Sequence, residues 1–512
     1  MLLSSCFLVT RAFRRTVAFV LAVTFFAIFA SSNLFAQNSQ AVLNPPPFEA
    51  WLAQSSLPSN SGAAWVQEIG SAKDASKPIF AHNANAPLNP ASVMKLYTTF
   101  AGLELLGAAY TWKTQVFAVG RDVVIKGGGD PRLRQQDVWR LLRELRLRGI
   151  TKIEGDWVLD HTAYAPEAVS ASAFDGEGMR PYNVAPDGLL MSFNATRILF
   201  TPALTDAAAW RVVADPLPAG WSVAGTVSAG NGSCGDWRRS LKLDIKPADI
   251  KPNNGNNAGG IITVGGSIPY ACGAQEIYRS IAPAAGFGAG LVRSLWSELG
   301  GTHSGGFRDL VQSSVAINSA LYYANAQLLA SVESDPLSEV IRDINKRSNN
   351  VMARSLFLSL GQTNNQNSGQ SGVLSNLTRA QGEAAMRAWL QSRGLDSPDL
   401  VFDNGSGLSR AERSTAAHIG RLLQAAYASP VMSELMSSLP IVGQDGTLKN
   451  RFKAMSGAAH LKTGTLNDVK AIAGYVLSNS GRRYVVVGMI NHARAAEGQA
   501  ALDKLVAWTQ GQ

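Results

Sequence analysis

The stretch that decides the fold is Asn89-Pro-Ala-Ser-Val-Met-Lys-Leu-Tyr-Thr-Thr-Phe-Ala-Gly-Leu-Glu-Leu-Leu106. Asn89 suits a helix N-cap, and Pro90 suits the first helical position, where no backbone donor is needed. Apolar residues then recur at helical spacing as far as Leu106, and Gly107 suits the end of the helix. The stretch therefore predicts a helix with polar side chains in its first turn.

Two of those polar side chains, Ser92 and Lys95, are candidates for chemistry. They lie three residues apart, so a helix places them on one face, one turn from each other. A serine hydroxyl is a weak nucleophile until a neighbour accepts its proton. A lysine can do so only when neutral, and burial or nearby positive charge would lower its pKa from about 10.4. Taken alone, Ser-x-x-Lys is short and more often marks an ordinary solvated helix start than a catalytic pair.

The composition indicates a globular protein preceded by a targeting segment. The chain has 512 residues, of which 46% are hydrophobic and 16% charged, enough for two or three domains. Three arginines precede an apolar run that ends at Ala30, and Leu34-Phe-Ala36 is a candidate cleavage site. We interpret residues 1–36 as a secretory signal peptide, which predicts a periplasmic protein; an uncleaved anchor is the alternative. No second membrane span is predicted.

Charge and cysteine content limit the kinds of molecule that the protein is expected to bind. Cleavage would remove three arginines and no acid, so the formal charge of +9 falls by three; the remaining bias fits an anionic polymer or a solubilising surface. Cys234 and Cys272 would remain and are expected to pair in an exported protein, restraining the Asn- and Gly-rich stretch 253–260. No His/Cys cluster has metal-ligand spacing, and Gly127–Pro131 lacks the ending of a phosphate loop. We expect no metal, no cofactor and no nucleic acid.

The order of predicted elements indicates one α/β domain interrupted by an insert. Strands at 63–70 and 78–82 precede the Ser92 helix. Strand-like runs dominate from 107 to 320, with one amphipathic helix near 138–145. Helical periodicity then returns, and the chain ends with a β-meander and a helix. The later helices are predicted at 324–331, 337–347, 350–360, 380–393, 415–428 and 500–510. Residues 37–106 and 321–512 would form the α/β domain, and residues 107–320 the β-rich insert.

Two more short motifs lie in the C-terminal half. Ser348-Asn-Asn350 falls between two predicted helices, and Lys462-Thr-Gly-Thr465 falls on a predicted strand. Ser-x-x-Lys, Ser-x-Asn and Lys-Thr-Gly in this order are typical of penicillin-binding proteins and serine β-lactamases. Each motif is weak alone, whereas three in order on suitable elements are specific.

The long insert resembles that of the class C low-molecular-mass penicillin-binding proteins, the D-alanyl-D-alanine carboxypeptidase/endopeptidase family of the penicillin-binding protein 4 type. Further similar stretches are Gly127–Leu133, Tyr182–Pro186, Asp403–Arg410 and Leu439–Thr447. The resemblance covers nearly all of the mature chain. It implies an α/β serine transpeptidase/β-lactamase-like domain, split by two further domains, one nested in the other. The second motif is Ser-Asn-Asn rather than the more usual Ser-Asp-Asn, but its middle residue is not expected to touch the chemistry.

The resemblance and the chemistry of acyl transfer assign roles to the motif residues. The catalytic residues would be Ser92, Lys95, Ser348 and Asn350, and the substrate-binding residues Lys462, Thr463, Gly464 and Thr465. Ser92 would attack, Lys95 would accept its proton, and Ser348 would relay a proton to the leaving nitrogen. Asn350 would hold the substrate amide and keep Lys95 in place. Lys462 would meet a terminal carboxylate and lower the pKa of Lys95, and Gly464 would let the substrate backbone lie close to the strand. The resemblance places the oxyanion donors at the backbone N–H groups of Ser92 and Thr465.

The expected function is a serine-type D-alanyl-D-alanine carboxypeptidase/endopeptidase that acts on peptidoglycan stem peptides and is acylated by β-lactams. One alternative is a serine β-lactamase, although no deacylating Glu-x-x-x-Asn is found and the gap between the first two motifs is too long. Another is a catalytically weak peptidoglycan-binding protein, which the intact motifs argue against. The balance of the two peptidase activities, loose membrane contact and a homodimer stay open. Candidates for an acid that binds the diamino acid side chain are Asp175, Glu177 and Asp187.

Overall fold

The computed structural model describes residues 46–70, 77–167, 169–203, 209–248, 259–310, 322–363 and 376–512. Residues 47–512 form one compact unit. The predicted signal peptide, the polar segment as far as residue 45 and residues 253–258 of the Asn- and Gly-rich stretch lie outside the described residues. In the described ranges, no helix combines the length and apolar character needed to cross a membrane.

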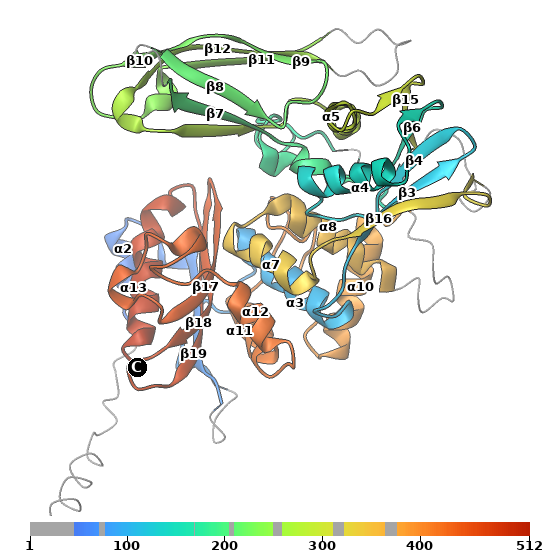
Figure 1. Ribbon diagram of the computed structural model, residues 1–512. Helices are drawn as coiled ribbons and strands as arrows, with labels where there is room; N and C mark the ends of the chain where they lie inside the picture. The colour runs from blue at the N-terminus through green and yellow to red at the C-terminus, as the bar shows by residue number, and fades with distance from the viewer. Residues whose placement is uncertain are drawn as a thin grey trace, which may run out of the picture. The chain divides into compact units, whose positions relative to one another are not determined.

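An antiparallel sheet joins the two ends of the described chain (Figure 1). Its strands, in spatial order, are β17 (Ala459–Leu466), β18 (Val469–Leu477), β19 (Arg483–Asn491), β1 (Gly62–Glu68) and β2 (Phe80–His82). The pairing of β1 with β2 and the β17–β18–β19 meander confirm the strands predicted from the sequence. β18 and β19 are buried along almost their whole length, as expected of strands covered on both faces.

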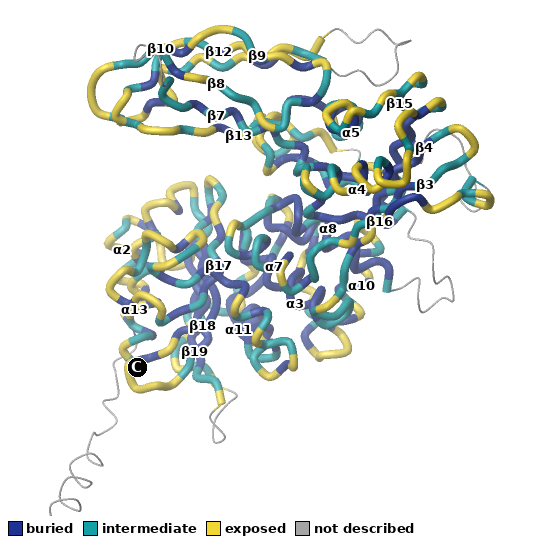
Figure 2. The backbone as a smooth tube through the Cα atoms, viewed as in Figure 1, coloured by how far each residue is buried: buried dark blue, intermediate teal, exposed yellow. Residues whose placement is uncertain are grey.

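Helices cover both faces of this sheet. α2 (Phe48–Gln54) and α13 (Gln499–Gln510) pack on one face through a core that includes Phe48 and Leu502. The other face carries α3 (Lys95–Leu105), α7 (Leu337–Lys346), α8 (Asn350–Leu360), α10 (Arg379–Ser392), α11 (Ala416–Tyr427) and α12 (Met432–Ser438). Figure 2 shows the central strands among the most deeply buried parts of the chain. The predicted helices at 337–347, 350–360, 380–393, 415–428 and 500–510 are confirmed.

The predicted helix at Pro90 begins later than expected. Ala91–Met94 form a 3-10 turn, and α3 starts at Lys95. Ala91 has a φ of 45°, while the Asn89 side chain accepts a hydrogen bond from the Ala91 N–H at 2.8 Å. The chain is crowded here, because a Cβ on Gly407 would lie 1.9 Å from the Ala91 carbonyl oxygen. Ser92 therefore sits on a tight turn that leads into the helix rather than on the helix itself.

The segment between α3 and α7 folds around two larger sheets. The first has the order β15 (Phe307–Leu310), β6 (Trp157–Asp160), β4 (Asp122–Lys126), β3 (Lys113–Val119) and β16 (Gln327–Glu333). The second contains β11 (Leu241–Pro247), β12 (Gly260–Pro269), β10 (Val227–Gly230), β8 (Ala209–Asp215), β7 (Thr196–Pro202) and β13 (Gln275–Arg279), with β9 (Trp221–Gly225) paired to β12. A minor sheet joins β5 (Lys152–Ile153) and β14 (Thr302–His303), and the helices are α4 (Gln135–Leu147) and α5 (Ala284–Glu298).

Some sequence-based predictions for this segment were wrong. Residues 324–331 were expected to be helical, but residues 327–333 form β16, which pairs antiparallel with β3. A short apolar run fits a helix or a strand, and here Leu329 and Ala330 complete the core beneath the sheet. Helices α2, α5 and α12 were not predicted.

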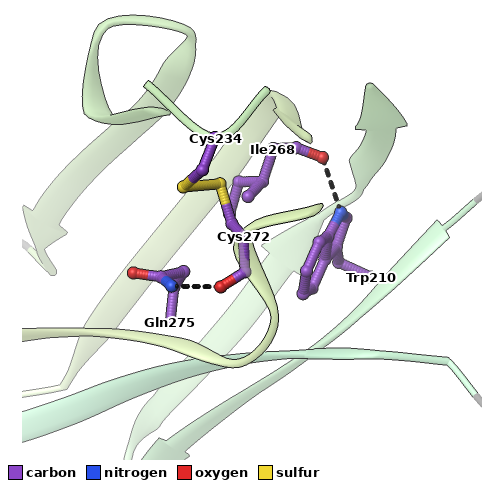
Figure 3. Close-up of a disulfide and its surroundings, with 5 residues drawn as sticks. All are labelled: Trp210, Cys234, Ile268, Cys272 and Gln275. Atoms are coloured by element: carbon purple, nitrogen blue, oxygen red, sulfur yellow. Dashed lines mark hydrogen bonds between the residues drawn. A yellow bond between two sulfur atoms is a disulfide. The ribbon is translucent and has the colours of Figure 1, made fainter. Parts of the chain in front are cut away.

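Cys234 and Cys272 are joined by a disulfide, with their Cα atoms 4.7 Å apart (Figure 3). Next to it, the Gln275 side-chain amide donates to the Cys272 carbonyl at 2.7 Å. The Trp210 indole N–H donates to the Ile268 carbonyl at 3.0 Å. The bridge thus links the segment before β11 to the turn after β12, at one end of the second sheet.

This disulfide gives a prediction for the exported protein. Mass spectrometry of unreduced peptides should recover Cys234 joined to Cys272, and two free thiols would contradict the pairing. The bridge spans 38 residues, so replacing both cysteines by serine should destabilise the β7–β13 sheet by about 2–4 kcal/mol. Denaturant unfolding followed by tryptophan fluorescence would measure the change, since Trp210, Trp221 and Trp237 lie in or beside this sheet.

Candidate active site

The predicted pair of Ser92 and Lys95 is brought together with Asn350, the first residue of α8. Lys95 Nζ lies 2.9 Å from Ser92 Oγ and 2.7 Å from Asn350 Oδ1, and it also contacts the Ser406 carbonyl oxygen. The oxygens of Asn350 and Ser406 can only accept hydrogen bonds. In a neutral lysine, both N–H groups would point to these two oxygens. The nitrogen lone pair would then face the Ser92 hydroxyl, which is the arrangement a general base requires.

The surroundings of Lys95 favour this neutral form. The side chain is fully buried, and burial lowers the pKa of Lys95 well below its ordinary value. The positive charge of Lys462 lowers the pKa of Lys95 further, while the Glu412 carboxylate acts in the opposite direction. The sequence predicted burial and a neighbouring cation as the causes, and both are present.

Lys462, on β17, reaches the second motif. Its Nζ donates to Ser348 Oγ at 2.9 Å and to the Thr463 carbonyl at 2.8 Å. Lys462 is fully buried, and burial lowers the pKa of Lys462 to about 7. An anion beside the amine would restore the charged form. Ser348 has a φ of 55°, an uncommon conformation for a residue with a side chain, which is often found at functional sites.

Gly464 has a structural role that the sequence did not indicate. A Cβ at this position would lie 2.5 Å from the Pro90 carbonyl oxygen and 3.1 Å from the Ala91 Cβ. The space beside Gly464 is therefore filled by the chain's own backbone, and the glycine lets β17 lie against the Ser92 turn. The two neighbouring threonines do not face the Ser92 turn in this way. Thr463 Oγ1 lies 2.8 Å from Thr447 Oγ1, and Thr465 is exposed.

Sequence reasoning missed Glu412, which organises the turn that contacts Lys95. The side chain is fully buried, and its Oε1 accepts hydrogen bonds from the N–H groups of Asp403, Asn404 and Gly405 at 3.4, 3.1 and 2.8 Å. This turn presents the Ser406 carbonyl to Lys95. The sequence signal was an acid shortly after a turn rich in Asn and Gly, but it did not show which groups the acid would bind.

The three candidate acids for the diamino acid side chain all have partners within the insert. Asp187 Oδ1 lies 2.5 Å from Nδ1 of the buried His161. Glu177 forms an ion pair with Arg180 at 3.2 Å. The exposed Asp175 accepts hydrogen bonds from the Tyr182 hydroxyl at 2.8 Å and the Asn183 amide at 2.7 Å. In the part of the chain that the structure describes, no group of three or more His, Cys, Asp or Glu is arranged to hold a metal ion.

A serine next to a buried lysine, with the Ser-x-Asn and Lys-Thr-Gly segments meeting beside an antiparallel sheet, defines a serine hydrolase of the penicillin-binding protein/β-lactamase class. Residues 47–512 match the D-Ala-D-Ala carboxypeptidase 3 (S13) family, and the chain belongs to that family. It is a serine D-Ala-D-Ala carboxypeptidase, and its fold is that of penicillin binding protein 4. The substrate of this family is cell-wall peptidoglycan, so the protein acts outside the cytoplasm.

Two relatives illustrate the similarity. The D-alanyl-D-alanine carboxypeptidase of Actinomadura sp. (strain R39) is 26% identical over 444 residues, which cover 84% of this chain and 78% of that protein. The crystal structure of penicillin binding protein 4 (dacB) from Haemophilus influenzae shares the fold with a TM-score of 0.67. Its sequence is 21% identical, and the match covers 90% of this chain and 98% of that one.

Proposed function

We propose that the protein cleaves the terminal D-Ala-D-Ala bond of peptidoglycan stem peptides through an acyl-enzyme on Ser92. The observation that carries this proposal is the position of Lys95 Nζ, 2.9 Å from Ser92 Oγ and held by two groups that can only accept. In the first step, Ser92 Oγ attacks the carbonyl carbon while its proton passes to Lys95. The backbone N–H groups of Ser92 and Thr465 would stabilise the oxyanion.

Ser348 and Lys462 complete the reaction at the leaving group. The carbon–nitrogen bond breaks as the proton that Lys95 took from Ser92 passes through Ser348 to the departing D-Ala nitrogen, which leaves Lys95 neutral again. Ser348 is held for this relay by a 2.9 Å hydrogen bond from Lys462. Lys462 also meets the carboxylate of that D-Ala, whose charge stabilises the ammonium form. Water then attacks the ester carbonyl and gives a proton to the neutral Lys95, which returns it to Ser92 Oγ as the ester bond breaks.

β-Lactams would acylate the same serine. Opening of the ring by Ser92 follows the same proton path, but the leaving group stays attached to the acyl-enzyme. A Haemophilus influenzae penicillin binding protein 4 of the same fold was crystallised in complex with a novel β-lactam, which supports the proposal. Incubation with a fluorescent penicillin tests it: stable labelling is expected, rapid turnover would indicate a β-lactamase, and no labelling would indicate a binding protein.

The proposal extends to domain organisation and export. We propose that the N-terminal part of the catalytic domain ends near residue 106, and that its second part starts after β16, which still pairs with β3, rather than at residue 321. Residues 1–36 would be a cleavable signal peptide that directs the protein to the periplasm. N-terminal sequencing of the exported protein would locate the cleavage site.

Glu412 gives a prediction for the pH dependence of acylation. The Glu412 carboxylate raises the pKa of Lys95, so Glu412→Gln should lower that pKa further. The acid limb of the acylation rate, where protonated Lys95 is inactive, should therefore move to lower pH. Glutamine keeps an oxygen for the turn's N–H groups, so the melting temperature should change little. The measurement is the rate of penicillin acylation against pH.

The matched control for this variant is Asp403→Asn, which removes a partly exposed carboxylate from the same turn. Asp403 forms an ion pair with Arg379, whereas the charges that shift the pKa of Lys95 are those of Lys462 and Glu412. In Asp403→Asn, the acid limb of the acylation rate against pH should stay where it is in the wild type. If the limb of Glu412→Gln also stays in place, Glu412 does not set the charge of Lys95.

A further inference from the structure

An arginine-rich cavity borders the second motif. Its volume is about 1040 Å³, and its wall includes Ser348, whose hydroxyl accepts a hydrogen bond from Lys462. The arginines that line it are Arg132, Arg134, Arg180, Arg238, Arg279 and Arg347. The acids in its lining are Glu276 and Asp343. The lining is thus strongly cationic and adjoins a residue of the proposed reaction.

Most of these arginines have carboxylate partners. Arg132 forms ion pairs with Asp335 and Asp343, both at 3.1 Å. The others are paired as follows: Arg134 with Asp137 and Asp335, Arg347 with Asp343, and Arg180 with Glu177. Of the lining acids, Glu276 lies 4.0 Å from Arg197, a residue outside the cavity lining. These pairs account for four of the six arginines.

Arg238 and Arg279 differ from the others. Within the described ranges, neither has a carboxylate at ion-pair distance. Arg238 lies over the Trp237 ring at 4.5 Å, and the Arg279 guanidinium donates to the neighbouring Tyr278 carbonyl at 2.9 Å. Arg180, Arg238 and Arg279 line the same cavity. Burial lowers the pKa of Arg279, the charges of Arg180 and Arg238 lower it further, and the Glu177 carboxylate acts in the opposite direction. Such a cluster is stabilised by an anion.

We propose that this cavity binds an internal carboxylate of the peptidoglycan stem peptide, a group distinct from the terminal carboxylate that meets Lys462. A guanidinium group binds a carboxylate through two parallel hydrogen bonds, and Arg238 and Arg279 can both turn toward one such group. Ser348 belongs both to the cavity wall and to the reaction, so a peptide acylating Ser92 can extend into the cavity. The exposed rings of Tyr182 and Tyr278 line the same cavity and offer apolar faces to the peptide. This inference rests on the proposed function.

The test compares two synthetic stem peptides that end in D-Ala-D-Ala. In one, the α-carboxylate of an internal γ-linked D-glutamyl residue is free, and in the other it is an amide. The wild-type enzyme should prefer the free acid by about three- to tenfold in kcat/KM, mainly through KM and more strongly at low salt. The double variant Arg238→Gln/Arg279→Gln should bring the acid-to-amide ratio close to one.

Arg239→Gln is the matched control, because Arg239 adjoins Arg238, pairs with Asp236 and does not line the cavity. Its acid-to-amide ratio should equal that of the wild type. An equal ratio in the wild type and the double variant would overturn the proposal, as would a cavity that binds a phosphodiester polymer and ignores the internal carboxylate.

Binding of the two peptides to the Ser92→Ala protein, measured by calorimetry, repeats the comparison without turnover. A preference for the free acid that needs Arg238 and Arg279 supports the cavity even if no D-Ala is released. Failure of the proposed reaction and failure of the proposed subsite are therefore distinguishable. The same comparison is made with a triple variant that also carries Arg238→Gln and Arg279→Gln. If the ratio of acid to amide affinity is the same in Ser92→Ala and in the triple variant, the proposed subsite is wrong.

Discussion

Ser92→Ala protein is expected to show no covalent labelling by a fluorescent penicillin and no release of D-Ala from stem peptides. The side chain of Ser92 carries the oxygen that would form the acyl bond, and Lys95 Nζ lies 2.9 Å from it. In the part of the chain that the structure describes, this is the one Ser-x-x-Lys pair, so no neighbouring hydroxyl takes its place by the same route. The fold should survive, because alanine is compatible with the 3-10 turn at Ala91–Met94.

Gel fluorescence after incubation with the labelled penicillin measures this effect, and thermal unfolding checks the fold. Ser437→Ala removes an exposed hydroxyl from α12 and serves as the control for a serine-to-alanine change. It should label as the wild type does. Persistent labelling of Ser92→Ala would mean that another residue carries the acyl group, and the proposed mechanism would fail.

The second large effect is expected at Lys462. A charge-assisted hydrogen bond to the terminal carboxylate contributes roughly 1.5–3 kcal/mol, so Lys462→Ala should lower kcat/KM by about ten- to a hundredfold or more. The loss of the neighbouring cation would also raise the pKa of Lys95. A smaller fraction of Lys95 would then be neutral, and able to act as a base, at a given pH. Lys462→Arg keeps the charge in a fully buried site shaped for a smaller group and should fall between.

The sign of the pH effect distinguishes carboxylate binding from a general defect. Burial lowers the pKa of Lys462 to about 7, so the free enzyme carries the cation below that pH and loses it above. The preference of the wild type for a free C-terminal acid over its amide should therefore weaken as the pH rises through about 7. Lys462→Ala should have little preference at any pH.

The measurement is kcat/KM for a D-Ala-D-Ala peptide and for its C-terminal amide, each across the pH range. Lys453→Ala, which removes an exposed lysine, is the control and should keep both the preference and its pH dependence. An unchanged acid-to-amide ratio in Lys462→Ala would mean that another group binds the carboxylate, and the role proposed for Lys-Thr-Gly would be wrong.

Much of the architecture could be predicted because it follows from local patterns. Helices α7, α8, α10, α11 and α13 each carry an apolar stripe at helical spacing, and the β17–β19 meander has short turns between apolar runs. The family could also be recognised, because three motifs in order are far more specific than any one of them. These features depend on residues close to one another in the chain.

Predictions failed where distant segments decided the outcome. The apolar run at 327–333 became a strand because β3 offers it a partner edge more than 200 residues earlier in the chain. The turn at Ala91–Met94 is 3-10 rather than α-helical where the glycine turn at 405–407 and β17 press against it. Gly464 is needed for that same contact, which the sequence did not indicate.

The sequence by itself determined the class of the protein and the residue types of its site, because nucleophile, base, amide and cation each occupy a recognisable motif. Only the tertiary structure decided which form of Lys95, neutral or protonated, is favoured at that site. Burial and the charges of Lys462 and Glu412 act on Lys95 across segments hundreds of residues apart, and the Ser406 carbonyl takes the third position around its amine. Desolvation and Coulomb interactions depend on distance in space, which spacing along the chain does not encode.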